Sequence, residues 1–231
     1  MKRSRQSTIT RQNEAVFREA VASESKKLHA KILVDLGCGD GAESFHLGEF
    51  VGAKTIMGID HELSTLRSFI KRGGCGIASD FNQPLPLKNK SVDGIICNQV
   101  IEHVAKTDLM MAEMHRILKP GGWAIVCTPN LASWHNIFSL LFGWQPFSTQ
   151  VSDQSFVGNP AHPNYNQKID EMQAHLRVFS PRGLTDLARL HGFSIQQAKG
   201  VGYYPLPYPL NSICAKIDSL HAAYLLAVLR K

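Results

Sequence analysis

Short apolar runs alternate with segments of helical periodicity over roughly the first 130 residues, and most runs end in a polar residue or a glycine cluster. Apolar runs bounded by turn residues are typical of buried strands, whereas apolar residues three to four positions apart are typical of helices. Strands that alternate with helices favour a mostly parallel sheet with helices on both faces. The pattern predicts strands over residues 31–35, 54–59, 76–79, 91–98 and 123–128, with helices over 41–51, 62–72 and 109–118.

The regular alternation is interrupted from about residue 130 to 176, where aromatic residues, proline, asparagine and histidine are frequent. We interpret this stretch as an insertion with one or two short helices. The alternation returns at Ser180-Pro181, a typical N-cap and first helical position, which predicts a helix as far as His191. A strand over 193–198, a helix over 211–219 and a last strand over 224–229 complete the predicted elements.

Positive charge is concentrated near the N-terminus. The chain has 231 residues, of which 44% are hydrophobic, and a formal net charge of +6. Residues 1–31 hold eight Lys and Arg but only three Glu, so most of the excess lies there. We therefore divide the chain into a basic N-terminal helical segment, residues 1–30 with a helix over 12–29, and one α/β domain, residues 31–231. The basic segment could contact RNA or an anionic membrane surface, or be a solvated tail.

The cysteines and the hydropathy profile favour a cytoplasmic protein. Five cysteines form an odd set without metal-type CxxC spacing, so we expect reduced thiols in a reducing compartment. We find neither an apolar core of signal-peptide length nor a run of about 18 apolar residues. His162 and His175 lack a tight set of partners in the sequence, so no metal site is predicted.

A glycine-rich turn follows the first predicted strand as Asp35-x-Gly37-x-Gly39-x-Gly41. Glycines let the backbone turn tightly and approach a ligand closely. The spacing differs from the G-x-G-x-x-G of pyrophosphate-binding nicotinamide sites. Asp60 ends the second strand, where a carboxylate can accept hydrogen bonds from both ribose hydroxyls, or could instead cap the next helix.

Polar groups also end the third and fourth predicted strands, as Asp80-Phe81 and Asn98. Ligands of open α/β sheets bind outside the carboxyl ends of the strands, so the sequence predicts a nucleoside-type site at this edge. With these motifs the chain resembles the class I S-adenosylmethionine-dependent methyltransferases, in particular the small-molecule branch with a Lys-Pro-Gly-Gly turn. The matching segments lie within residues 30–200 and comprise 34–41, 58–60, 80–81, 91–93, 102–104, 113–122, 178–180 and 191–193.

The resemblance implies a Rossmann-like three-layer α/β/α sandwich with a seven-stranded sheet of order 3-2-1-4-5-7-6, in which strand 7 is antiparallel. It implies S-adenosylmethionine as cofactor and S-adenosylhomocysteine as product. In such a site Asp35 would anchor the methionine amino group, and Asp60 would hold the ribose hydroxyls. The Asp80 carboxylate would accept from the adenine amine, while the Phe81 N–H would face a ring nitrogen. The remaining cofactor contacts would come from Gly37, Cys38, Gly39, Gly41, His61 and Asn98.

The methyl acceptor leaves a weaker signal. A hydroxyl acceptor needs a base, and His103, just beyond the fourth strand, is the first candidate. His135, His162 and His175 in the insertion are alternative bases and pocket residues. Trp134 and Phe138, with Tyr203 further along, could line a pocket for a hydrophobic acceptor, and the apolar stretch 134–147 could instead be a lid, a dimer contact or a membrane-facing segment.

Three functions are compatible with this pattern. The first is O-methylation of a hydroxyl on a small or medium-sized hydrophobic or saccharide-type metabolite. The second is methylation of RNA through the basic N-terminus, which the nearly neutral remainder of the chain disfavours. The third is a non-catalytic cofactor-binding regulator, which the intact set of Asp35, Asp60 and Asp80 disfavours. Peripheral membrane contact and the oligomeric state stay open.

Overall fold

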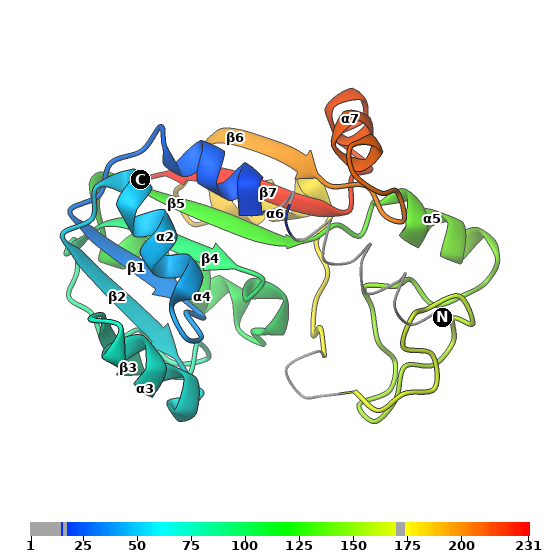
Figure 1. Cartoon of the computed structure of the whole chain (residues 1–231), viewed down its shortest axis with the longest axis horizontal. Coiled ribbons are helices and arrows are strands. Elements are labelled where there is room, and N and C mark those ends of the chain that lie inside the picture. The colour runs from blue at the N-terminus through cyan, green and yellow to red at the C-terminus, as the bar shows by residue number, and fades with distance from the viewer. Residues whose placement is uncertain (1–14, 16–17, 170–173) are drawn as a thin grey trace.

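The computed structural model describes residues 15, 18–169 and 174–231, and its centre is one seven-stranded sheet (Figure 1). The strand order is β3-β2-β1-β4-β5-β7-β6, and β7 is antiparallel to both β5 and β6. This confirms the predicted order and the antiparallel last strand. The strands are β1 Ile32–Leu36, β2 Thr55–Asp60, β3 Cys75–Ala78, β4 Val92–Asn98, β5 Leu118–Pro129, β6 Ser194–Val201 and β7 Tyr224–Arg230.

Helices cover both faces of the sheet because successive side chains of a strand point to opposite sides. Ile95 of β4 packs in one core cluster with Met114 and Leu184, whereas Ile96 packs in a second cluster with Leu47. The three-layer sandwich is therefore confirmed. The helices are α2 Ala42–Val51, α3 Leu63–Lys71, α4 Thr107–Ile117, α5 Trp134–Leu141, α6 Pro181–Leu190 and α7 Leu210–Ile217, with a 3-10 helix η1 at Ile101–His103.

The Lys-Pro-Gly-Gly segment lies inside β5, not between a helix and a strand. We expected the helix to include Leu118 and the strand to begin at Trp123, but α4 ends at Ile117 and β5 begins at the next residue. Pairing with β4 shifts register between Val92 and Gly94, and residues 119–122 fill the irregularity. The Gly121 N–H donates to the carbonyl of Lys231 at 3.0 Å, so the residue that follows β7 extends the pairing of β5 with β7 to this segment.

The described part of the N-terminal segment packs on the sheet. Residues 18–25 are helical, four residues short of the predicted end at 29, and residues 12–14, 16 and 17 of that prediction lie outside the described residues. The chain turns at 26–27, which brings Leu28 into the core together with Val21. The buried Glu24 carboxylate accepts from the ammonium groups of Lys27 and Lys199 at 2.9 and 2.7 Å. Part of the positive charge of this segment is therefore paired.

The segment that we interpret as an insertion contains α5, and its described residues after α5, 142–169 and 174–176, form no regular helix. In Figure 1 it lies beyond the carboxyl ends of β4 and β5. Buried asparagines hold its start, since the Asn130 amide donates to the carbonyls of Leu220 and Ala222 at 2.9 and 2.8 Å. Among the helices in the described ranges, none has the length and apolar character needed to span a bilayer.

Candidate active site

The glycine loop between β1 and α2 is tight on one side and open on the other. Gly37, Gly39 and Gly41 have φ of 76°, 51° and 83°, a region that favours glycine. A Cβ added at Gly37 would lie 2.4 Å from a methyl group of Val100, and one at Gly41 would lie 2.5 Å from the Phe69 ring. A Cβ at Gly39 would meet no protein atom within 4 Å. The loop therefore presents backbone at Gly39 to free space.

Asp35 is a buried acid directly before this loop. Its carboxylate accepts a short hydrogen bond from the Ser44 hydroxyl of α2. Burial raises the pKa of the Asp35 carboxyl to about 7, and the Ser44 hydroxyl opposes that rise. A cationic group that binds near Asp35 would favour its ionised form. Cys38 packs against Leu66 and Phe69, and burial raises the pKa of its thiol to about 12, so it is a neutral core residue.

Asp60 braces the loop from the end of β2. One carboxylate oxygen accepts from the Gly39 N–H at 2.9 Å and the other from the Glu62 N–H at 2.9 Å. Glu62 itself is the N-cap of α3, so Asp60 does not cap that helix through its side chain. Carboxylate oxygens have further lone pairs, which leaves capacity for two ligand hydroxyls. His61 lies 3.5 Å from the Asp60 carboxylate, and its side chain is exposed.

The third and fourth strand ends add polar groups to the same edge. Asp80 is exposed, and its carboxylate accepts from the backbone and the side-chain amide of Asn82 at 2.8 and 2.9 Å. Phe81 is buried. At the end of β4 the Asn98 side-chain oxygen and the Gln99 side-chain nitrogen are buried without a hydrogen-bond partner among the described residues. Buried polar atoms without partners point to a ligand or ordered water at this place.

The sheet brings these groups together because β3, β2, β1 and β4 are neighbours and parallel. Their carboxyl ends therefore meet at one edge, as the sequence predicted. Asp35 pairs in register with Gly58 of β2 and with Ile96 of β4. The residues that we predict to contact the cofactor therefore lie along one edge of the sheet, from Asp80 after β3 to Asn98 at the end of β4.

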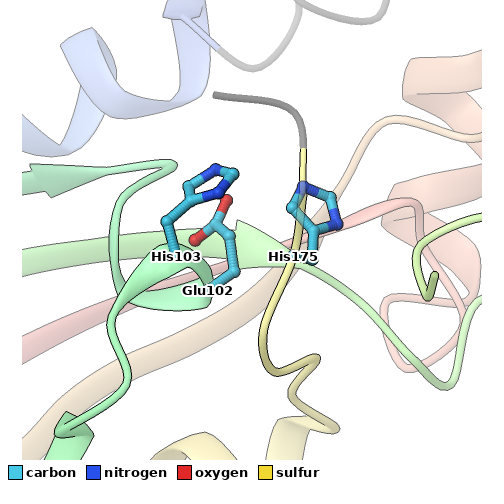
Figure 2. Close-up of side chains that lie close together, drawn as sticks. All are labelled: Glu102, His103 and His175. Atoms are coloured by element: carbon cyan, nitrogen blue, oxygen red, sulfur yellow. The ribbon is translucent and has the colours of Figure 1, made fainter. Parts of the chain in front are cut away.

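A second cluster lies directly beyond β4. Figure 2 shows the Glu102 carboxylate beside the His103 ring, with His175 facing them from the segment before α6. Each of the three offers a ligand-type atom, and these atoms all lie within 4.8 Å of one another. Glu102 is 0% exposed, and burial raises the pKa of its carboxyl to about 7. The two rings are 5.0 Å apart between centroids.

Backbone carbonyls hold both imidazoles of this cluster. The His103 Nδ1 is 2.9 Å from the carbonyl oxygen of Ala174, and the His175 Nδ1 is 2.8 Å from that of Ser148. A carbonyl only accepts, so each Nδ1 carries the hydrogen and each Nε2 has a free lone pair when the ring is neutral. Burial lowers the pKa of His175, which favours its neutral form.

The other predicted acceptor residues fall into two further groups. His135 and His162 flank the Phe147 ring, at 5.4 and 5.5 Å between centroids. Phe147 precedes Ser148, so this group adjoins the cluster at His175. Burial lowers the pKa of His135 to about 4, so that ring is neutral near pH 7.

The second group lies between α5 and α7. The Trp134 indole N–H and the Tyr203 hydroxyl both donate to the Asp218 carboxylate at 2.7 Å, and Phe138 packs beside Trp134. The structure therefore joins His103 with His175 and does not bring all six predicted pocket residues into one contact group.

Sequence reasoning missed Glu102 and Gln99 as site residues. Glu102 lies beside His103 in a segment with the apolar residues Val100, Ile101 and Val104, and this surrounding was the available signal of a buried acid. Its proximity to His175 had no local signal, because the two residues lie on segments far apart in the chain. The contact is tertiary, since the N–H groups of Leu176 and Arg177 donate to the Glu102 carbonyl at 2.8 and 3.1 Å.

Known proteins with similar sequences and folds include methyltransferases. Residues 34–126 match a family model described as a methyltransferase domain. The chain is 24% identical over 188 residues to a protein of Mycolicibacterium smegmatis named as a probable S-adenosylmethionine-dependent methyltransferase, with 72% of this chain and 62% of that protein covered. It thus spans less than two thirds of that relative.

Two further matches cover more of the length of the matched protein. The chain is 26% identical over 213 residues to the ubiquinone biosynthesis O-methyltransferase of Chromobacterium violaceum, with 87% of this chain and 78% of that protein covered. An S-adenosylmethionine-dependent methyltransferase of Mesorhizobium loti has a crystal structure that matches with a TM-score of 0.60 and 18% identity, over 88% of this chain and 92% of that one. The structural match supports the same fold.

Proposed function

Because this chain belongs to the class I S-adenosylmethionine-dependent methyltransferases and has S-adenosylmethionine as its cofactor, we propose that it methylates a hydroxyl group of a small or medium-sized acceptor. The proposed acceptor is a hydrophobic or saccharide-type metabolite. The observation that carries the proposal is the continuous site at the carboxyl ends of β3, β2, β1 and β4, with a histidine next to it.

The cofactor fits this edge group by group. Asp35 would receive the methionine amino group, whose positive charge suits a buried carboxylate without a cationic partner. The open face at Gly39 would admit the ribose and methionine portions, and Asp60 would accept from the ribose hydroxyls. Asp80 and the Phe81 N–H would take the adenine ring. Asn98, whose side-chain oxygen lacks a partner, would contact the methionine end.

Methyl transfer from this position needs alignment and one proton acceptor. Bound S-adenosylmethionine would supply an activated sulfonium methyl group. The acceptor oxygen would form a bond to the methyl carbon while the carbon–sulfur bond breaks, and the electron pair of the broken bond would remain on sulfur. The hydroxyl proton would pass to the His103 Nε2, which the Nδ1 contact with the Ala174 carbonyl leaves with a lone pair. His103 ends η1, five residues after Asn98 at the end of β4, so in this arrangement it would lie on the side of the transferred methyl group.

Exposed apolar side chains support a hydrophobic acceptor. Phe138 and Phe142 at α5 are 51% and 68% exposed, and Ile217 at the end of α7 is 82% exposed. Trp134 joins α5 to the loop after α7 through its contacts with Asp218 and His221. A surface of this kind suits a greasy substrate or a membrane interface. One relative of this chain is named as a ubiquinone biosynthesis O-methyltransferase.

A methyl-transfer assay with a panel of acceptors tests the proposal. Phenolic quinone precursors, saccharides and a short RNA are each incubated with S-adenosylmethionine that carries a labelled methyl group, and the product is identified by mass spectrometry. The account predicts label on a hydroxyl oxygen of a phenol or saccharide. Transfer to RNA alone, or to no acceptor by protein that binds the cofactor, would contradict it.

A further inference from the structure

We propose that Glu102, His103 and His175 form a binding site for a divalent first-row transition metal ion, with Zn²⁺ as its reference occupant. The role we give this ion, to hold the acceptor oxygen beside the sulfonium methyl, rests on the proposed function. Metal binding itself does not depend on that function and can be measured without an acceptor.

The separation of the three side chains suits one ion. Their candidate ligand atoms lie within 4.8 Å of one another. Zinc binds imidazole nitrogen and carboxylate oxygen at about 2.0–2.2 Å, which sets ligand atoms roughly 3–4 Å apart in a tetrahedral site. The ligand atoms would have to move closer together than this limit of 4.8 Å to enclose one ion.

The Glu102 carboxylate is buried without a cationic partner among the described residues. Both of its oxygens lack a well-formed hydrogen bond to a described residue, and its side chain is 0% exposed. The described cations make no ion pair with it, and the nearby Thr128 hydroxyl also lacks a well-formed hydrogen bond. Burying a carboxylate alone is unfavourable, whereas a metal ion would supply the missing positive charge.

Both histidines make a backbone contact of the kind that metal-binding histidines make. Each places its Nδ1 on a backbone carbonyl, that of Ala174 for His103 and that of Ser148 for His175. Hydrogen bonds of this type fix the ring and direct the Nε2 lone pair to the metal in many metalloproteins. The hydrogen bonds from the Leu176 and Arg177 N–H groups to the Glu102 carbonyl hold the two segments together. The site is therefore built by several contacts rather than by the proximity of three side chains alone.

The donor set selects the class of ion. Two imidazoles and one carboxylate suit zinc, iron(II) or cobalt(II), whereas magnesium and calcium prefer oxygen ligands. Three protein ligands leave at least one position open, as in catalytic zinc sites. An acceptor hydroxyl bound there would lose its proton to solvent more readily, because the ion lowers its pKa. In that case His103 would act as a metal ligand, and no histidine base would be needed because the ion lowers the pKa of the hydroxyl.

Cobalt(II) titration of chelator-treated protein tests the site, because the ion reports its ligands through its visible absorption. The wild type is compared with Glu102→Gln, His175→Gln and the control His191→Gln, whose half-buried side chain contacts Asp108 outside the cluster. We expect one equivalent of Co²⁺, displaced by Zn²⁺, in the wild type and in the control. Either cluster substitution should weaken binding by at least about tenfold.

Cofactor binding and circular dichroism, measured on the same preparations, separate the possible failures. Absence of saturable Co²⁺ binding by folded wild type, or unchanged binding in both cluster variants, would overturn the metal site. If S-adenosylmethionine still binds in that case, the proposed methyl transfer survives with His103 as base. If Co²⁺ binds and S-adenosylmethionine does not, the metal site stands and the proposed function falls.

Discussion

Replacement of the buried Asp35 by asparagine should stabilise the cofactor-free protein while it weakens cofactor binding. Burial raises the pKa of Asp35 from 3.8 to about 7, so the folded state resists ionisation of this group. A raised carboxyl pKa means that the free energy of unfolding falls as pH rises from about 4 to 7. At about 1.4 kcal/mol per pKa unit, the charged Asp35 lowers that free energy by roughly 4 kcal/mol above pH 7.

The Asp35→Asn variant gains less free energy of unfolding than the roughly 4 kcal/mol that the charged Asp35 costs the wild type. The asparagine amide nitrogen would be buried without a known acceptor, and its oxygen would bind the Ser44 hydroxyl less strongly than a carboxylate does. These two changes together lower the free energy of unfolding of the variant by about 1–3 kcal/mol. We therefore expect Asp35→Asn to be more stable than the wild type by roughly 1–3 kcal/mol at about pH 8, with the difference reversed or lost near pH 4.

Urea unfolding at several pH values measures this difference. Asp93→Asn is the matched control, because Asp93 lies on the neighbouring strand β4 and its pKa is lowered, against the effect of burial, by Lys119 and by backbone N–H groups. The free energy of unfolding of Asp93→Asn should fall near pH 8, whereas that of Asp35→Asn should rise. Destabilisation of Asp35→Asn at about pH 8 by as much as the control would refute the reasoning about Asp35.

Three further predictions follow from single contacts. Gly39→Ala should reduce the affinity for S-adenosylhomocysteine by at least about tenfold in calorimetry and lower the free energy of unfolding by about 1–2 kcal/mol. Gly41→Ala should lower the free energy of unfolding by more, because its Cβ would meet Phe69, and equal effects of the two variants would contradict the open face at Gly39. Cofactor affinity of the wild type should rise with pH through about 7, as Asp35 ionises, and that of Asp35→Asn should not. Arg116→Ala should lower the unfolding free energy by roughly 2–4 kcal/mol in urea without a change in cofactor affinity, since Arg116 binds the Glu113 carboxylate and the Leu85 carbonyl away from the site.

Local signals predicted the strands, whereas the order of the sheet and its antiparallel last strand came from the resemblance to the class I methyltransferases. The apolar runs of β1, β2 and β5 end next to Gly37, at Asp60 and at Pro129, so these strands are visible without knowledge of their neighbours. The same holds for the cofactor edge, because Asp35, Asp60 and Asn98 mark strand ends directly. The Ser180 N-cap was also local, and its hydroxyl accepts from the Gly183 N–H at 3.2 Å.

Features set by tertiary contacts could not be predicted in this way. Residues 119–122 read as a turn, yet β5 includes them because the C-terminal Lys231 pairs with Gly121 and Gly122. The grouping of Glu102 with His175 depends on how the segment before α6 crosses η1, and no periodicity in either segment encodes that crossing. The division of the pocket residues among three groups likewise depends on where Phe147 and Asp218 pack.

Isothermal titration with S-adenosylmethionine and S-adenosylhomocysteine, for the wild type and Asp60→Ala, tests the central claim most directly. We expect one saturable site in the wild type and an affinity at least about tenfold lower in Asp60→Ala. The affinity should fall because Asp60 would hold the ribose and its carboxylate also accepts from the Gly39 N–H. Lack of binding by folded wild-type protein, or equal affinity in Asp60→Ala, would contradict a cofactor site at the carboxyl ends of these strands.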